Sequence, residues 1–242
     1  MSQPAVFDID RLDLNFTPKP WSFAETRRAE IDAHFAELQR EKPALWNGRV
    51  LLLYRQVVSD GVFRGDYLET DYASFTAWRH WAPPKSGVHD CFGAAALVSA
   101  DGAVLLGLMG EHTANAGQIY LPAGTPDPSD IIEGKVDLAW SVARELKEET
   151  GLDVSDLAIE RGWTTVVDGQ LIVQNKILRS RETADALRKR ILAHLASEKQ
   201  PELADVRFVR SPRDFVSAMP PYVTTFLKRF FDAGLAGQPA SA

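Results

Sequence analysis

The sequence predicts a mixed α/β (α+β) chain, in which a small N-terminal α+β unit precedes a larger domain. Three Asp-Gly dipeptides, at 60–61, 101–102 and 168–169, each separate two apolar, β-rich runs. Asp-Gly between such runs is a strong signal for a β-hairpin. Other stretches repeat apolar residues at helical spacing. The composition, 45% hydrophobic and 25% charged, is that of an ordinary globular protein.

The N-terminal unit is predicted to span residues 1–85. Three prolines make residues 1–20 look irregular, and the Pro83-Pro84 pair marks the boundary to the next domain. Between them we expect a helix from Ser22 to the residue before Pro43, strands at 49–59 and 62–70, and a short helix at 72–78.

The second domain is predicted to span residues 86–234, followed by a flexible tail at 235–242. A loop rich in Pro, Gly and Asp is expected at 122–135, and a helix at 137–150 that Gly151 ends. The other predicted strands are 92–99, 103–109, 118–121, 157–167, 171–179 and 206–209, and the other predicted helices are 182–198, 213–216 and 222–231.

Charge and cysteine content exclude several function classes. The net charge is −6 with no strong basic cluster, which argues against binding to a nucleic-acid polymer. No apolar run approaches the roughly 20 residues that span a bilayer, so no membrane partner is expected. The single cysteine, Cys91, permits no intrachain disulfide and fits a cytoplasmic protein.

The segment from Arg144 to Leu152, RELKEETGL, carries the chemistry. On a helix, Glu145, Glu148 and Glu149 stand at i, i+3 and i+4 and share one face, where like charges repel. One interpretation is a solvated acidic face. The other is a site for a hard divalent cation, which takes carboxylate oxygens together with substrate phosphates. An acidic protein needs such a cation to hold a diphosphate.

This segment resembles the second half of the Nudix box, G-x5-E-x7-R-E-U-x-E-E-x-G-U, and matches all seven fixed positions of that half. The preceding LPAG resembles the residues that lead into the box, and the similarity covers residues 88–231, approximately. The resemblance implies a Nudix α/β/α sandwich with a mixed sheet. It also implies hydrolysis of a diphosphate bond with the help of Mg²⁺ or Mn²⁺.

The first half of the box departs from the family pattern. If Gly124 matches the box glycine, the loop that follows is six residues longer than the consensus. The position of the consensus glutamate holds Val136, and Asp137 or Glu133 could replace it. In the family this acid mostly orders the loop.

The resemblance also implies roles for individual residues. Glu145, Glu149 and Glu148 would bind the metal, with the carbonyl of Ala123 as a further ligand. Arg144 would orient the glutamates, and Gly124 would contact the substrate. The family often recruits one more acid as a ligand or general base, for which Glu198 and Glu202 are candidates.

The substrate is predicted to be a nucleoside diphosphate sugar such as UDP-glucose. The order of the N-terminal elements and the lengthened loop are similar to the Nudix branch that hydrolyses UDP-sugars. Alternatives are another diphosphate (ADP-ribose, a dinucleotide, coenzyme A or a damaged nucleotide) and a non-catalytic ligand sensor. We expect ordinary core and turn roles, in preference to base stacking, for Trp46, Asn47, Tyr72 and Trp78. A homodimer is possible, as in many family members.

Overall fold

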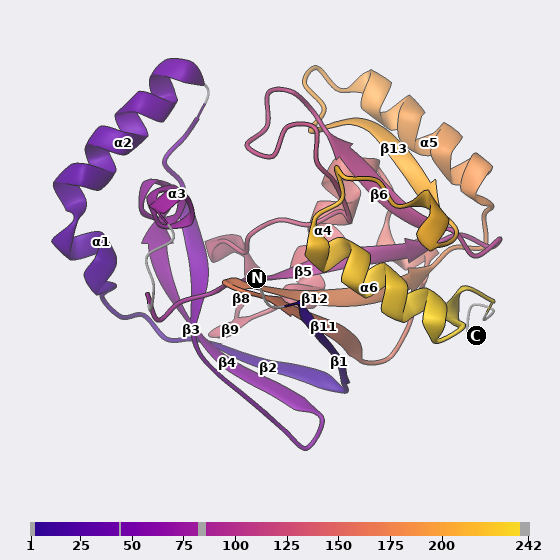
Figure 1. The fold of residues 1–242 in the computed structure, drawn as a ribbon, viewed down its shortest axis with the longest axis horizontal. Helices are drawn as coiled ribbons and strands as arrows, with labels where there is room; N and C mark the ends of the chain where they lie inside the picture. The colour runs from indigo at the N-terminus through magenta and orange to yellow at the C-terminus, as the bar shows by residue number, and fades with distance from the viewer. Residues whose placement is uncertain (1–2, 44, 82–85, 238–242) are drawn as a thin grey trace. The chain divides into compact units, whose positions relative to one another are not determined.

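The computed structural model describes residues 3–43, 45–81 and 86–237 (Figure 1). The chain forms two compact units. The sandwich unit comprises residues 1–10, 92–124 and 138–242, and the smaller unit comprises 11–91 and 125–137. No helix in the described part of the chain is long and apolar enough to cross a membrane.

These units divide the chain differently from the predicted ranges. The first ten residues belong to the sandwich unit, and the boundary near the predicted one falls after Cys91. Pro83 and Pro84 lie outside the described residues. Of the predicted tail, Leu235–Gly237 forms a 3-10 helix whose first two residues pack on the core, and residues 238–242 lie outside the described part.

The sandwich unit is built on one sheet with the strand order β1-β11-β12-β5-β6-β13, to which β7 and β10 add short pairings. All strand pairs for which a register is defined in this sheet are antiparallel. Its strands are β1 (Ala5–Ile9), β5 (Asp90–Val98), β6 (Val104–Met109), β7 (Ile119–Tyr120), β10 (Ala158–Ile159), β11 (Trp163–Asp168), β12 (Leu171–Arg179) and β13 (Leu203–Val209).

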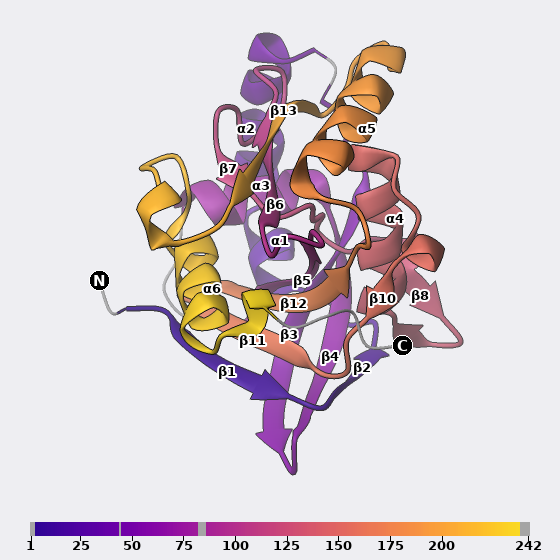
Figure 2. The same cartoon turned by 90° about the vertical axis from the view of Figure 1, so that its right-hand side faces the viewer.

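Helices cover both faces of this sheet (Figure 2). In β5, the ring of Phe92 packs against the ring of Tyr222 in α6 (Pro221–Asp232), with 6.3 Å between the two ring centroids. The next residue, Gly93, lies against Val142 of α4 (Leu138–Thr150). Because neighbouring strand residues face opposite sides, α4 and α6 lie on opposite faces. The third helix, α5 (Ala184–Ser197), packs beside α4. The predicted α/β/α sandwich is therefore confirmed.

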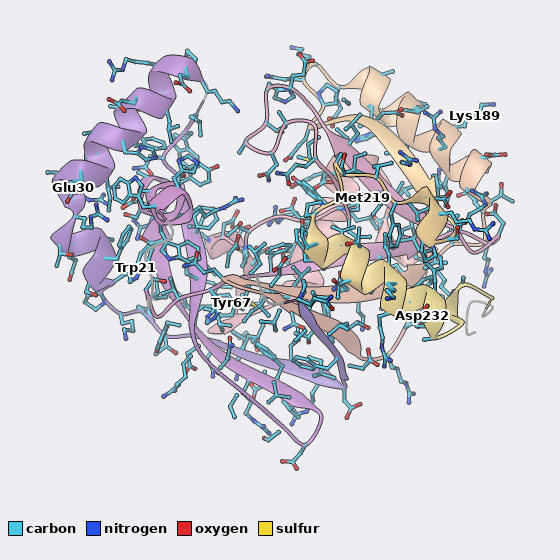
Figure 3. The ribbon with its side chains drawn as sticks, in the orientation of Figure 1. Trp21, Glu30, Tyr67, Lys189, Met219 and Asp232 are labelled. Carbon is cyan, nitrogen blue, oxygen red and sulfur yellow. The ribbon has the colours of Figure 1, made fainter. Side chains whose placement is uncertain are left out.

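The smaller unit has a five-stranded sheet with the order β3-β4-β2-β9-β8, which is mixed because β2 runs parallel to β4. Tyr67 of β4, labelled in Figure 3, donates its hydroxyl hydrogen to the carbonyl of Cys91 at 2.9 Å, and its side chain is fully buried. The elements of this unit are β2 (Arg11–Phe16), α1 (Ser22–Thr26), α2 (Arg28–Glu41), β3 (Arg49–Ser59), β4 (Val62–Asp71), α3 (Tyr72–Trp81), β8 (Ile131–Ile132) and β9 (Lys135–Val136).

Two predicted irregular segments are in fact ordered as strands. Residues 1–20 contain β1 and β2, because the prolines lie outside an alternating apolar-polar pattern that pairs with β11 and β4. The predicted loop 122–135 contains a 3-10 turn (Pro128–Asp130), β8 and the start of β9. The loop therefore extends the sheet of the smaller unit through the pairing of β9 with β2.

Candidate metal and phosphate site

Helix α4 positions the three acids of the RELKEETGL segment. Glu145 and Glu149 are buried, whereas the Glu148 side chain is 60% exposed. Leu146 faces the core of the sandwich unit, so the glutamates lie at the border between the packed and open sides of the helix. Gly151 adopts φ 71° and ends the helix, as predicted. We call Glu145, Glu148 and Glu149 the acidic face of α4.

The LPAG segment lies directly against this face. The backbone N–H of Ala123 donates to Glu149 Oε1 at 3.2 Å. A Cβ atom on Gly124 would stand 2.2 Å from Glu145 Oε1, so a larger residue here would require the Glu145 carboxyl group to move. The segment is held in place by β5, because Ala95 donates its N–H to the carbonyl of Pro122 at 2.9 Å. The predicted loop residues and two of the predicted acids thus share one location.

Arg144 neutralises part of the acidic face. Its Nη1 atom lies 2.9 Å from Glu145 Oε1 and 3.3 Å from Glu148 Oε2. The arginine therefore pairs with two of the three glutamates. No ion pair reaches Glu149 from the residues that the structure describes.

Glu149 is a buried carboxyl group with few compensating contacts among the described residues. Its residue is 3% exposed, and its Oε2 atom has no hydrogen-bond partner among the described residues. Burial raises the pKa of this carboxyl well above its usual value, and the charges of Glu202, Glu145 and Glu148 raise it further. The Ala123 N–H opposes the shift. A buried carboxylate with an open oxygen is costly unless a cation compensates it.

The two candidates for the additional acid have different surroundings. Glu202, which directly precedes β13, has a raised pKa because it loses solvent and lies near Glu148, while His112 opposes the rise. Glu198 instead lies 3.4 Å from His194 Nε2 at the end of α5. Glu202 is therefore influenced by the charge of the acidic face, whereas Glu198 pairs with a histidine.

The two residues proposed to replace the box glutamate, Glu133 and Asp137, lie in different parts of the chain's structure. Glu133 is exposed in the turn between β8 and β9, with φ 50°. Asp137 directly precedes α4 and donates its N–H to the carbonyl of Asp130 at 2.9 Å. Asp130 itself is completely buried and accepts a hydrogen bond from the Asp127 N–H. The sequence analysis does not single out Asp130, although Asp127-Pro-Ser-Asp130 is a capping-box pattern.

The donor set fits a hard divalent cation. Carboxylate and carbonyl oxygens are the ligands that Mg²⁺ and Mn²⁺ prefer. In the described part of the chain, no three His, Cys, Asp or Glu side chains already converge as a metal cage. This agrees with Arg144 holding Glu145 and Glu148. The Oε2 atom of Glu149, which has no hydrogen-bond partner among the described residues, is the oxygen that a cation would contact first.

Most of the aromatic and amide residues singled out in the smaller unit have structural roles. Trp78 is buried, and its indole N–H donates to Ser86 Oγ at 2.7 Å. Asn47 accepts a hydrogen bond from the Ala73 N–H, and Tyr72 packs against neighbouring rings. Trp46 differs from them, because it is 81% exposed.

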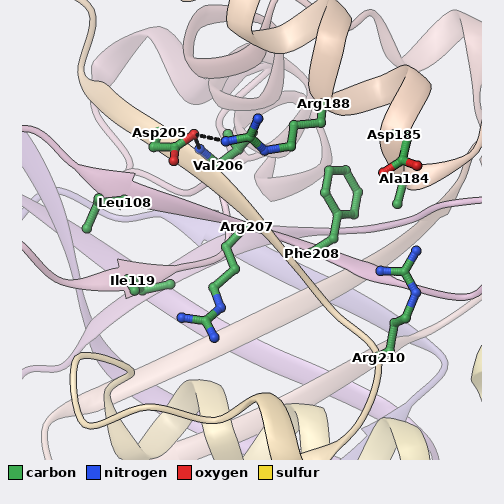
Figure 4. Close-up of a pocket in the computed structure, with 10 residues that line it drawn as sticks. All are labelled: Leu108, Ile119, Ala184, Asp185, Arg188, Asp205, Val206, Arg207, Phe208 and Arg210. Atoms are coloured by element: carbon green, nitrogen blue, oxygen red, sulfur yellow. Dashed lines mark hydrogen bonds and ion pairs between the residues drawn. The ribbon is translucent and has the colours of Figure 1, made fainter.

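A separate cavity of about 450 Å³ lies along β13 (Figure 4), and it contains none of the predicted site residues. Arg188 and Arg210 in its wall are already paired with Asp205 and Asp101. Strand β13 ends the sheet, and charged side chains such as Arg207 protect open sheet edges from pairing. We therefore assign this cavity no part in the site.

No family model matches the chain, and no curated protein matches it significantly. Solved Nudix hydrolases are among the structures that it resembles. RenU from M. smegmatis is 15% identical, with a TM-score of 0.41 over 64% of this chain and 90% of that one. MutT from Methanosarcina mazei is 21% identical, with a TM-score of 0.39 over 60% and 95%. The C. elegans Ap4A hydrolase is 18% identical, with a TM-score of 0.40 over 60% and 98%. Similarity at this level does not itself assign an activity.

Proposed function

We propose that this chain is a Nudix-type hydrolase that cleaves a diphosphate bond in a nucleoside diphosphate derivative with the help of Mg²⁺ or Mn²⁺. The observation that carries the proposal is the buried Glu149 carboxyl, which faces other acids and has an open oxygen. The match of RELKEETGL to the box supports the same conclusion. A solvated acidic face would not bury two of its three carboxyl groups beside a glycine loop.

Glu145, Glu148, Glu149 and the carbonyl of Ala123 would hold the metal. A divalent cation in this position would neutralise the charge of a diphosphate and make its phosphorus easier to attack. Arg144 keeps Glu145 and Glu148 oriented. Gly124, whose backbone lies against Glu145, would contact the substrate.

Glu202 is proposed as the proton acceptor. It lies close enough to Glu149 for their charges to interact, and it stands outside the helix that carries the metal ligands. As the water oxygen bonds to phosphorus, its proton passes to the Glu202 carboxylate. The bond from phosphorus to the bridging oxygen then breaks, which gives a nucleoside monophosphate and a second phosphate ester.

The substrate is proposed to be a nucleoside diphosphate sugar such as UDP-glucose. This finer assignment rests on the N-terminal arrangement that resembles the UDP-sugar branch, and on the lengthened loop. In that assignment the N-terminal unit predicted at residues 1–85 recognises the part of the substrate beyond the diphosphate. A homodimer and a cytoplasmic location remain predictions.

A product screen tests this proposal. The purified chain is incubated with nucleoside diphosphate sugars, ADP-ribose, dinucleotides and coenzyme A, each with Mg²⁺, with Mn²⁺ or with a chelator, and products are separated by chromatography. We expect UMP and a sugar 1-phosphate from UDP-sugars, only with metal. Faster cleavage of another member would correct the substrate. Absence of metal-dependent turnover across the panel would favour a ligand sensor instead.

A further inference from the structure

The smaller unit brings two histidine rings together on its surface. Helix α2 packs beside α3 (Figure 1), which places His34 of α2 next to His80 of α3. The Nε2 atom of His34 and the Nδ1 atom of His80 are 2.9 Å apart, so one ring donates a hydrogen bond to the other. His80 is exposed and His34 is partly exposed, so ions in solution can reach the pair. The residues are 46 positions apart, and spacing in the sequence gives no sign of the contact.

An aromatic wall supports one of the two rings. The Trp81 ring lies against His34, with 5.4 Å between the ring centroids. Trp81 is itself covered by the guanidinium of Arg27, which stands 4.2 Å from its ring centroid, and it packs edge-on against Phe23 at 5.9 Å. These contacts limit the movement of His34, whereas the exposed His80 ring keeps room to turn.

The two helices that carry the rings are also fastened to each other. Arg28 of α2 donates from Nη1 to Asp71 Oδ2 at 2.9 Å and from Nη2 to the hydroxyl oxygen of Ser74. Beneath the polar contacts lies a small apolar cluster made by both helices, whose buried members are Ile31, Phe35, Ala73 and Ala77. The separation of the two imidazoles is therefore set before any ligand binds, and preorganisation of this kind lowers the entropic cost of binding.

The distance between the two ring nitrogens suits a shared transition-metal ion. Metal–imidazole bonds are about 2.0–2.1 Å long, so two of them at a right angle place their nitrogens about 2.9 Å apart. Cu²⁺ and Ni²⁺ adopt such square-planar arrangements with nitrogen and oxygen ligands. Coordination needs a neutral imidazole. Burial lowers the pKa of His80, as do the charges of His34 and Arg79, which favours the neutral ring.

We propose that His34 and His80 form a two-histidine site for Ni²⁺ or Cu²⁺, which replaces their hydrogen bond and links α2 to α3. On binding, the ring that donates in the hydrogen bond moves its proton to its other nitrogen. Each ring then turns its lone pair to the metal, and water fills the remaining positions. In the described part of the chain no three His, Cys, Asp or Glu side chains converge, so the protein supplies two ligands.

This site does not depend on the proposed function. It lies in the smaller unit, whereas the acidic face of α4 belongs to the sandwich unit. The two sites also differ in chemistry, because carboxylate oxygens select hard cations such as Mg²⁺ and imidazole suits Ni²⁺ and Cu²⁺. Saturating Mg²⁺ should therefore leave binding of Ni²⁺ to the two histidines unchanged.

The first test titrates Ni²⁺ into the full chain by calorimetry, with saturating Mg²⁺ present. Wild type should bind one Ni²⁺ ion, and His34→Asn and His80→Asn should each weaken binding at least tenfold, since loss of even an outer partner of a metal ligand costs about 10–100-fold. His112→Asn is the matched control, a histidine of the sandwich unit, and should bind as wild type does. Equal affinities in wild type and the two variants, or no binding by wild type, would overturn the inference.

The second test identifies the ligands with one equivalent of Cu²⁺ and electron paramagnetic resonance. The chain carries Glu149→Gln, which weakens the proposed metal site in the sandwich unit. We expect coupling of the copper to two imidazole nitrogens, and to one in chains that also carry His34→Asn or His80→Asn. A spectrum without nitrogen coupling, or one that neither substitution changes, would overturn the inference.

Thermal unfolding guards against a variant that fails to fold. Ni²⁺ should raise the melting temperature of wild type, because it binds the folded chain. His80→Gln keeps a polar side chain at an exposed position, and it should fold as wild type does and lose the rise. A rise that persists in folded His80→Gln would contradict the inference. If wild type binds Ni²⁺ through both histidines and has no turnover, the proposed function fails while this inference stands.

Discussion

Two buried carboxyl groups, one in each unit, have opposite surroundings. Asp66 of the smaller unit is 6% exposed and is fully satisfied, because Asn15 donates to one oxygen and Arg55 to the other. Glu149 of the sandwich unit is equally buried, yet it receives one backbone N–H and faces three acids. Proteins pair the charges that they bury for stability.

The difference between the two carboxyl groups supports the proposed role of Glu149. Asp66 completes a network in which each oxygen has a donor, so nothing needs to be added. The surroundings of Glu149 instead disfavour its charged form, which a bound cation would compensate. Perturbed carboxyl groups of this kind gather at functional sites, since ordinary packing does not retain them.

The largest expected effect comes from Glu149→Gln, which removes the charge and keeps the shape. Turnover should fall by about 10³-fold or more, because a metal site supplies several kcal/mol of transition-state stabilisation. In the metal-free chain the melting temperature should stay constant or rise, since an uncompensated buried charge is gone. Steady-state kinetics and thermal unfolding measure the two quantities.

Metal-dependent stabilisation sharpens the same comparison. Saturating Mg²⁺ or Mn²⁺ should raise the melting temperature of wild type through binding to the folded state, and Glu149→Gln should lose this rise. Glu37→Gln, an exposed helical glutamate of the smaller unit, is the control and should keep both properties. Turnover near wild type in Glu149→Gln would refute the assignment.

The next largest effect is expected from substitution of Asp90, a buried carboxyl group that accepts a hydrogen bond from the Thr125 hydroxyl at one oxygen. It is 3% exposed, and burial raises its pKa to about 6, against the opposing influence of Arg79 and the Thr125 hydroxyl. Because the folded pKa is raised, the protonated carboxyl favours folding. Its contribution is complete below about pH 4 and is lost as the pH rises through 6.

Asp90→Asn should therefore flatten the pH dependence of stability between about pH 4 and 7. At neutral pH the variant should gain up to about 3 kcal/mol, the equivalent of the raised pKa. Urea unfolding at a series of pH values measures this. An unchanged slope in the variant would show that Asp90 is not the titrating group.

Asp66→Ala is expected to have the opposite sign. It leaves the Asn15 amide without its partner and should cost about 1–3 kcal/mol. The metal-dependent rise in melting temperature should persist, since Asp66 lies in the smaller unit. Asp13→Ala, which removes an exposed partner of Lys135, should cost less. A loss of the metal effect in Asp66→Ala would break the contrast between the two carboxyl groups.

The local elements of this molecule could largely be predicted from the sequence. Asp60 and Gly61 both adopt positive φ in the hairpin between β3 and β4, because the dipeptide itself favours that turn. The spacing of the three glutamates placed them on one helix, and the following glycine ended it. These features depend on neighbours within a few residues, which the sequence shows directly.

Features that depend on distant pairing could not be predicted. The first ten residues join the sandwich unit only because β1 pairs with β11, some 160 residues later. The lengthened loop adds β9 to β2 of the smaller unit, a contact between residues 15 and 135. Gly110 reaches the carbonyl of Glu202 only through the pairing of β6 with β13. In each case sheet register, which a single sequence does not state, decides the neighbours.

The smallest expected effect comes from the opposite kind of charge change on α4. Lys147 lies 2.8 Å from Asp153, and both side chains are exposed. Lys147→Gln should change stability very little, and only at low salt, because water already screens the pair. Turnover should be unaffected. The variant changes the charge of α4 by one unit, as Glu149→Gln does, two residues away. If it altered turnover as much, the effect of Glu149→Gln would reflect the total charge of the helix and not a site at Glu149.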